Sequence, residues 1–218
     1  MKTALVFGSS GLIGGHLLNE LIKSDNYKKI KLFVRSDYGS NHSKTEIIKT
    51  DFNNLENHKE DIKGDDCFFC IGTTKQNSPD KNEYKRVELD VPKKIAQIAK
   101  SNLVNSFVFV SSGYADPKSS GDYLKFKGLV EEELKRLSFS KLGILRPSFL
   151  MGDRKEKRVG EKVGIFIFKL LSPLFLGPLK KMKPIHSKKV AKAMIKITNG
   201  DFKQNVFESN EIVEVSNS

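Results

Sequence analysis

Tyr123 and Lys127 are spaced so that their side chains could do chemistry together. On a helix, residues four positions apart share one face and lie one turn from each other. A lysine ammonium held beside a phenol favours the phenolate and moves a pKa of about 10 toward neutrality. Such a tyrosine can pass a proton to or from a substrate oxygen. Ser112, which ends an apolar run eleven residues earlier, would hold that oxygen, with Ser111 as the alternative.

Three glycines, Gly8, Gly11 and Gly14, stand where the first apolar run ends and an amphipathic segment begins. A glycine-rich string that joins a strand to a helix is typical of a dinucleotide-binding turn. Gly8 permits the tight turn, Gly11 lets the backbone approach a pyrophosphate, and Gly14 lets the helix pack closely on the strand. The amides and the positive dipole of the helix start would then face the phosphates.

Arg35 bears on which dinucleotide binds, because it ends the second apolar run, 21 residues after Gly14. An acid at this place accepts the adenosine ribose hydroxyls of NAD, whereas an arginine suits the 2′-phosphate of NADP. Asp37 follows two residues later and keeps NAD open as the alternative. We therefore expect NADP(H) to be favoured over NAD(H).

The hydrophobic pattern predicts the framework that would position these residues. Short apolar runs predict strands, and apolar residues at helical spacing predict helices between them. Their order favours a Rossmann-type, doubly wound parallel sheet with helices on both faces. We expect one domain over 1–218, in which about 150–218 include a small substrate-side region. The predicted strands are 3–7, 30–34, 45–50, 66–71, 106–111 and 142–145, and the predicted helices are 12–22, 91–100, 123–137 and 190–197.

The chain resembles the short-chain dehydrogenase/reductase superfamily, and within it the atypical, Tat-interacting-protein-like NAD(P)-binding branch. The resemblance covers about residues 1–200, through the motifs GSSGLIG at 8–14, CIGTTK at 70–75, VSSGYADPKSSGDYLKFKG at 110–128 and ILRPSFLMGDR at 144–154. It implies a catalytic set of Ser112, Tyr123 and Lys127, with Lys127 also holding the nicotinamide ribose. The implied cofactor contacts are Gly8, Ser10, Gly11, Leu12 and Ile13 at the pyrophosphate, Arg35 at the 2′-phosphate, Asp51 and Phe52 at the adenine, Ile71, Gly72 and Thr73 along the ribose and phosphate path, and Pro147, Ser148 and Phe149 beside the nicotinamide.

The chain departs from the superfamily pattern in two places. The fourth catalytic member, often an asparagine, is replaced near Asp90 or is absent. The substrate-side region is small compared with that of sugar-nucleotide epimerases, which argues against a nucleotide-sugar substrate.

The charge of the chain is concentrated rather than spread evenly. The 218 residues carry a net charge of +12, and residues 154–196 alone hold 13 basic and 2 acidic side chains. A lysine-rich composition is the explanation that we prefer, with an anionic partner as the alternative. Scarce arginine and the lack of a recognition-helix motif argue against a specific nucleic-acid partner.

Cysteine content and hydropathy exclude other classes. Cys67 and Cys70 are the only cysteines, and on a strand the two would face opposite sides, so we expect no metal site and no disulfide. No apolar run is long enough to predict a transmembrane helix. We expect a cytoplasmic protein, either a monomer or a homodimer, for which contact with a membrane surface stays open.

The leading hypothesis for function is an NADPH-linked oxidoreductase that reduces a small, partly apolar carbonyl substrate. The alternative is a catalytically silent NADP(H)-binding regulatory or scaffold protein, and the retained Tyr123, Lys127 and serine favour the enzyme. Residues 159–182 include an apolar stretch, 163–179, that two prolines interrupt. We expect this segment either to cover the nicotinamide end of the site or to pack permanently in the core or in a dimer interface.

Overall fold

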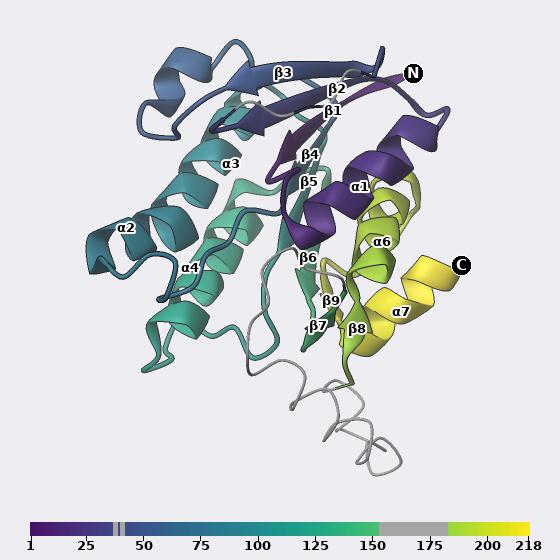
Figure 1. Cartoon of the computed structure of the whole chain (residues 1–218). Coiled ribbons are helices and arrows are strands. Elements are labelled where there is room, and N and C mark those ends of the chain that lie inside the picture. Colours follow the sequence, from purple (N-terminus) through teal and green to yellow (C-terminus); the bar gives the residue numbers. More distant parts are fainter. Residues whose placement is uncertain (37–38, 40–41, 153–182) are drawn as a thin grey trace.

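A seven-stranded parallel sheet forms the centre of the molecule (Figure 1). The computed structural model describes residues 1–36, 39, 42–152 and 183–218. The strand order is β3-β2-β1-β4-β5-β6-β9, and every neighbouring pair is parallel. The strands are β1 (Lys2–Phe7), β2 (Tyr27–Val34), β3 (Thr45–Lys49), β4 (Asp66–Phe69), β5 (Ser106–Val110), β6 (Lys141–Arg146) and β9 (Val206–Glu208). The predicted Rossmann-type doubly wound sheet is therefore confirmed.

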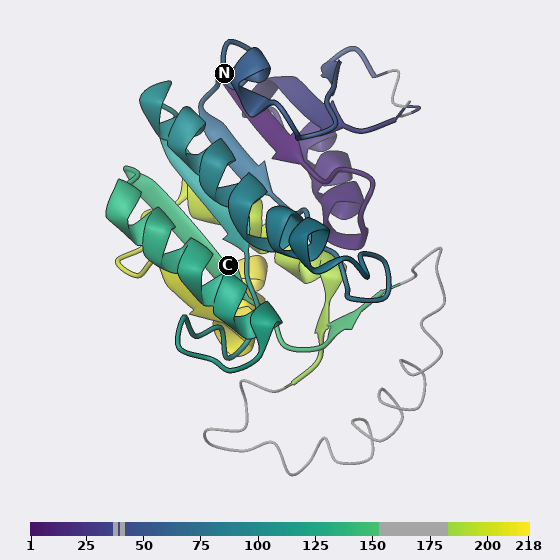
Figure 2. The ribbon, with the colours of Figure 1, turned by 90° about the vertical axis from the view of Figure 1, so that its left-hand side faces the viewer.

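Helices cover both faces of the sheet. On one face α1 (Leu12–Lys23) packs against α6 (Ser187–Asn199), and α6 packs against α7 (Ser209–Asn217). The other face carries α2 (Lys81–Lys85), α3 (Val91–Ser101) and α4 (Asp122–Leu137). Figure 2 shows α3 and α4 side by side across this second face. A short 3₁₀ turn over Leu55–His58 lies near α3.

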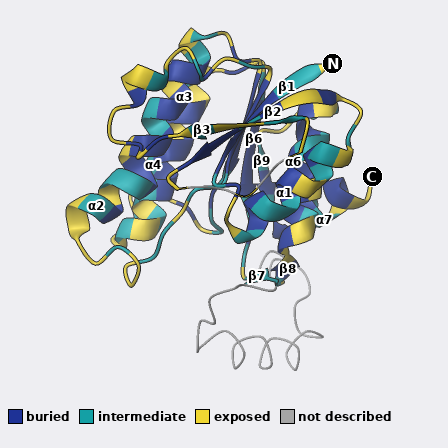
Figure 3. Cartoon of the chain, turned by 45° about the horizontal axis from the view of Figure 1, so that its top comes forward, coloured by how far each residue is buried: buried dark blue, intermediate teal, exposed yellow. Residues whose placement is uncertain are grey.

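The core has two halves, one on each side of the sheet, because the central strands are buried on both faces (Figure 3). Alternate residues of one strand enter different halves, as the two-residue period of a strand requires. Cys67 enters the half that α3 and α4 cover, whereas Cys70 packs against the half that α1 and α6 cover. The expected separation of the two cysteines is confirmed.

A buried polar cluster ties the sheet to the end of α6 at the amino ends of the strands. The Tyr27 hydroxyl donates to Asp66 Oδ2 at 2.7 Å and lies 2.9 Å from Thr198 Oγ1. Lys2 Nζ also lies 3.0 Å from Asp66 Oδ2 and donates to the carbonyl oxygen of Thr198 at 3.2 Å. Burial, followed by the nearby Asp66 charge, raises the pKa of Tyr27.

Two segments of the chain differ from the sequence prediction. The helix expected over 91–100 is present as α3, but it is preceded without a break by α2 and by a π-helical turn over Arg86–Asp90, neither of which was predicted. Toward the end of the chain, β9 and α7 were not predicted at all, since three residues are too few to show a strand pattern.

A second sheet has two short strands, β7 (Leu150–Met151) and β8 (Ile185–His186), which pair in parallel. These strands border residues 153–182, so the expected cover over 159–182 and most of its flanking bases lie outside the described residues, as does Asp37. Among the residues that the structure describes, no helix is long and apolar enough to cross a membrane.

Candidate active site

The glycine turn between β1 and α1 has the close packing that its sequence predicts. Gly8 has a φ of +90°, and a Cβ on it would lie 2.9 Å from the carbonyl carbon of Cys70. A Cβ on Gly14 would lie only 2.0 Å from the carbonyl oxygen of Gly8. A side chain at Gly8 would therefore force the turn away from the residues after β4, and one at Gly14 would force α1 away from the turn.

The amino end of α1 is open for an anion. Its N-cap is Gly11, which brings no capping side chain, and the first turn has no acidic residue. The amides of a helix start carry a partial positive charge and need acceptors. A pyrophosphate supplies such acceptors, so the turn fits a dinucleotide.

A cavity of about 250 Å³ opens beside this turn, at the carboxyl ends of β1, β2 and β4. This position is where open parallel sheets bind ligands. The cavity brings together a set of residues that the sequence predicted: Gly8, Ser10, Gly11, Arg35, Phe52, Ile71, Gly72 and Thr73. It also contains residues that the sequence analysis missed: Phe33, Val34, Cys70, Asn77, Ser78, Arg86, Val87 and Val91.

Arg86 gives the cavity a second arginine besides Arg35. Glu83 accepts two hydrogen bonds from its guanidinium, at 2.7 and 2.8 Å, and the Phe52 carbonyl accepts a third at 3.2 Å. Arg86 is thus held in place, whereas Arg35 is exposed at the end of β2. Two cations on one wall suit an anionic ligand.

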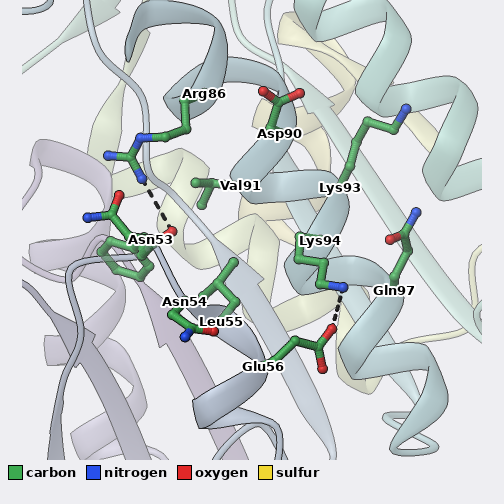
Figure 4. A pocket seen from close by; sticks show the side chains of 11 residues that line it. Asn53, Asn54, Leu55, Glu56, Arg86, Asp90, Val91, Lys93, Lys94 and Gln97 are labelled. Atoms are coloured by element: carbon green, nitrogen blue, oxygen red, sulfur yellow. Dashed lines mark hydrogen bonds and ion pairs between the residues drawn. The ribbon is translucent and has the colours of Figure 1, made fainter. Parts of the chain in front are cut away.

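A larger hollow of about 450 Å³ lies next to the cavity and shares Phe52, Arg86 and Val91 with it (Figure 4). Figure 4 shows an ion pair between Lys94 and Glu56 at this hollow. Neither hollow is lined by the predicted catalytic residues, but this one contains only Phe52 of the predicted cofactor contacts, whereas the smaller cavity contains eight of them. We therefore place the candidate site in the smaller cavity.

Lys127 is the most constrained of the predicted catalytic residues. It lies on α4, is 3% exposed, and its Nζ lies 3.1 Å from Glu88 Oε2. Nζ also donates to the carbonyl oxygen of Val110 at 3.3 Å, which fixes it at the end of β5. Burial is the largest single influence on Lys127 and opposes its charge, but Glu88, with smaller contributions from Tyr123 and Glu131, outweighs it, so the pKa of Lys127 is raised.

Tyr123 lies one turn before Lys127, and Lys127 Nζ is 5.9 Å from the centre of its ring. Its side chain is partly exposed, at the start of α4. The structure therefore places the tyrosine at the surface end of the helix and the lysine beneath it. The shared helix face that the spacing predicted is present.

The two serines after β5 have different surroundings. Ser111 is buried, and its hydroxyl donates to Glu131 Oε1 at 2.6 Å. Ser112 is half-buried, and within the described part of the chain its hydroxyl makes only a long hydrogen bond, 3.3 Å, to the Gly113 carbonyl. Ser112 is therefore the serine whose hydroxyl can turn to a ligand.

The loop after β6 lies against the loop after β5. Gly113 donates its amide hydrogen to the Pro147 carbonyl at 3.0 Å. Ser148 uses its hydroxyl to donate to the Lys183 carbonyl, at 2.5 Å, and Phe149 is 56% exposed. These residues lie near the serines but do not line the 250 Å³ cavity.

Three other predicted contacts also lie outside the cavity lining. Leu12 begins α1, and the Ile13 side chain packs in the core. The Asp51 carboxylate accepts hydrogen bonds from the amide and then from the side chain of Asn53, which lower its pKa.

Glu88 is the buried acid that the sequence analysis missed. We expected the replacement of the fourth catalytic member near Asp90, but Asp90 is exposed, and its carboxylate lies 3.9 Å from Lys85 Nζ. Glu88, two residues earlier, is 1% exposed. The missed signal is that Glu88, Val91 and Ile95 recur at helical spacing on one face.

The parallel doubly wound sheet, the packed glycine turn and the uncapped helix start together define a Rossmann-type dinucleotide-binding protein. The family model described as NAD(P)H-binding matches residues 8–200. The chain belongs to this NAD(P)H-binding family, in the atypical branch of the short-chain dehydrogenase/reductase superfamily, and the resemblance inferred from its motifs is confirmed.

Two relatives illustrate the range of similarity. Protein HTATIP2 of Rattus norvegicus is 33% identical over 166 residues, which are 73% of this chain and 67% of that protein. Protein FMP52-1, mitochondrial, of Scheffersomyces stipitis is 28% identical over 228 residues, with 98% of each chain covered.

Solved structures share the fold at lower identity. A UDP-N-acetylglucosamine 4-epimerase from Methanobrevibacter ruminantium M1, in complex with UDP-N-acetylmuramic acid, has a TM-score of 0.71 and 20% identity. The match covers 98% of this chain and 80% of that one. MoeE5 in complex with UDP-glucose and NAD has a TM-score of 0.69 and 18% identity, with the same coverage.

Proposed function

We propose that the protein is an NADP(H)-dependent oxidoreductase that reduces a small, partly apolar carbonyl compound. One observation carries this proposal: Tyr123 and Lys127 share a face of α4, and Lys127 is buried and charged at the end of β5. A surface pair of this spacing would leave the lysine in water. Burying a charged lysine costs free energy, and such residues are found preferentially at functional sites. Assisting proton transfer by the neighbouring tyrosine is a function that would account for this burial.

The residues divide the work of the reaction. The glycine turn and the start of α1 would hold the phosphates of the dinucleotide, and Lys127 would hold its nicotinamide ribose. When bound, the dinucleotide would supply the hydride. Tyr123 donates a proton to the carbonyl oxygen as that oxygen gains charge. Ser112 donates a hydrogen bond to the same oxygen, since its hydroxyl has no strong partner within the described structure.

The cofactor preference rests on the arginines of the cavity. Arg35 follows β2, and both Arg35 and Arg86 line the cavity. A guanidinium binds a phosphate through two parallel hydrogen bonds, which a ribose hydroxyl does not match. These residues support NADPH as the reductant, with NADH as the weaker alternative.

The expected substrate has an apolar body. Tyr123 and Phe149 are both large aromatic side chains that remain substantially exposed. They follow the carboxyl ends of β5 and β6, the side of the sheet where ligands bind. Aromatic surface of this kind favours an apolar ligand over a sugar.

The test is loss of NADPH absorbance with a panel of aldehydes, ketones and quinones. Tyr123→Phe should lower kcat by a factor of about 100 or more while the Kd for NADPH stays within about threefold. Tyr114→Phe, which changes an exposed tyrosine outside α4, is the control. If no carbonyl is reduced although NADPH binds, the protein is instead a silent NADP(H)-binding regulator or scaffold.

A further inference from the structure

Glu88 holds two parts of the site at once. Its Oε1 accepts a hydrogen bond of 2.5 Å from the amide of Thr73, in the cofactor-lining segment 71–73. Its Oε2 lies 3.1 Å from Lys127 Nζ. The carboxylate thus joins the segment after β4 to the lysine on α4. Its backbone lies in the π-helical turn between α2 and α3, and such turns are frequent at functional sites.

Lys127 depends on this carboxylate for its charge. The side chain is almost fully buried, and the Phe109 ring centre lies 4.8 Å from Nζ. A buried lysine without a counter-charge tends to lose its proton. Glu88 is therefore the group that keeps an ammonium, rather than an amine, beneath Tyr123.

Other ionisable groups face this pair from the surrounding elements. Tyr123 and Glu131 lie one turn to either side of Lys127 on α4, and both favour its charge. Glu131 is already bound by Arg146, at 2.6 Å, and by Ser111. Burial raises the pKa of Cys70, after β4, to about 12, and burial and then the Glu88 charge raise that of Tyr84, on α2, to about 12. Neither is ionised near neutral pH, so neither replaces Glu88.

We propose that Glu88 is a positioning residue that keeps Lys127 charged and fixes segment 71–73, so that the cofactor meets a site whose affinity stays constant across neutral pH. This role deepens the proposed function, because it concerns the same site. It requires only that the cofactor contacts Lys127 and segment 71–73, and it does not require turnover.

The substitution Glu88→Gln separates the two roles of the carboxylate. A glutamine oxygen can still accept from the Thr73 amide, but it has no charge to offer Lys127. We expect the Kd for NADPH of the unchanged protein to vary less than about threefold between about pH 6 and about pH 9. In Glu88→Gln the Kd should weaken about tenfold or more over that range, because burial without a counter-charge can lower the pKa of a lysine by about 3–5 units, and Lys127 would then lose its charge between these pH values.

A second readout observes Lys127 directly. In protein with isotope-labelled lysine, the Nζ and Cε signals of Lys127 are assigned by their loss in Lys127→Met and followed against pH by NMR. Glu88→Gln should move the Lys127 titration to lower pH by about three units or more, into the range of the binding measurements. Glu132→Gln, which removes an exposed carboxylate from α4, should leave both readouts unchanged.

The proposal would be overturned if the Kd for NADPH depended on pH in the same way in Glu88→Gln and in the unchanged protein. It would also be overturned if Lys127 titrated at the same pH in both proteins. If Glu88→Gln fails to fold, the double variant Glu88→Gln/Lys127→Met should fold, because it removes the unpaired buried charge. A double variant that is no more stable than the single one would also overturn it. Failure to find a carbonyl substrate would contradict the proposed function only. NADPH binding and the Lys127 titration could still be measured, because neither requires turnover.

Discussion

Ser111 and Ser112 differ in what their hydroxyl groups bind, although they are neighbours at the end of β5. Ser111 donates to the buried Glu131, which also accepts two hydrogen bonds from Arg146, at 2.9 and 2.6 Å. Ser112 has no such partner among the residues that the structure describes. A structural serine and a serine free to meet a ligand thus stand side by side.

We expect Ser111→Ala and Ser112→Ala to affect different properties. Ser111→Ala should lower the free energy of unfolding by about 2 kcal/mol, since it removes a hydrogen bond to a buried charged group. Ser112→Ala should leave stability within about 0.5 kcal/mol and lower kcat by a factor of about 10 or more. Urea unfolding and steady-state kinetics measure the two effects. Equal losses of stability would contradict the division.

Arg35 is expected to set the choice between the two dinucleotides. Arg35→Asp should weaken NADPH binding by a factor of about 10 to 100, because a carboxylate repels the 2′-phosphate and suits a ribose diol. Fluorescence titration with NADPH and NADH gives both affinities. Arg136→Asp, at an exposed arginine on α4, controls for net charge. Equal affinities for the two dinucleotides in the unchanged protein would exclude this role of Arg35.

At the scale of elements, α4 connects the site to the core through one row of side chains. Tyr123, Lys127 and Glu131 follow each other at intervals of one turn, from the partly exposed end of the helix inward. Lys127 pairs with Glu88, and Glu131 pairs with Arg146 at the end of β6. Opposite charges across each contact hold α4 in register with the strands.

The joint between β1 and α1 can be tested with two adjacent glycines. Gly14→Ala should abolish NADPH binding or folding, because its Cβ would lie 2.0 Å from the Gly8 carbonyl oxygen. Gly15→Ala places a Cβ 3.7 Å from the nearest atom, the Ser9 carbonyl oxygen, and should stabilise the helix by about 0.5–1 kcal/mol. Thermal unfolding and NADPH titration compare the two variants. A Gly14→Ala protein that binds normally would refute the packing role of Gly14.

At the scale of the whole molecule, the sequence predicted the elements whose pattern is local. The glycine turn, α1 and the buried strands were predicted from short apolar runs, from apolar residues at helical spacing and from the glycines between them. The three-residue β9 depends on its pairing with β6, and that contact leaves no local pattern. The site divides in the same way. Gly8, Arg35 and Thr73 were predicted to meet at the cofactor. The helical spacing of Glu88 with Val91 and Ile95 could have indicated that it is buried, but its pairing with Lys127, far along the chain, leaves no local pattern.

The cluster around Tyr27 is expected to limit stability at alkaline pH. The folded state holds the Tyr27 proton more tightly than the unfolded state, so stability is complete below the ordinary pKa of 10.0 and is lost as pH rises above it. Tyr27→Phe should cost about 1–3 kcal/mol near neutral pH and should show a shallower alkaline loss. Urea unfolding at several pH values tests this, with Tyr114→Phe as the control. An alkaline loss as steep as that of the unchanged protein would argue against Tyr27.

The same cluster has a consequence for the kinetics of folding. Lys2 and Thr198 are 196 residues apart in sequence, and α1 is buried against α6, from the far end of the described chain. Contacts between residues so far apart in sequence form late in folding, because closing a long loop loses chain entropy before the contacts can stabilise it. The packing of α1, whose amino end faces the proposed cofactor site, is therefore complete only after α6 has folded against it. We expect NADPH-binding competence to appear with the slowest phase of refolding, well after most of the helical signal in circular dichroism.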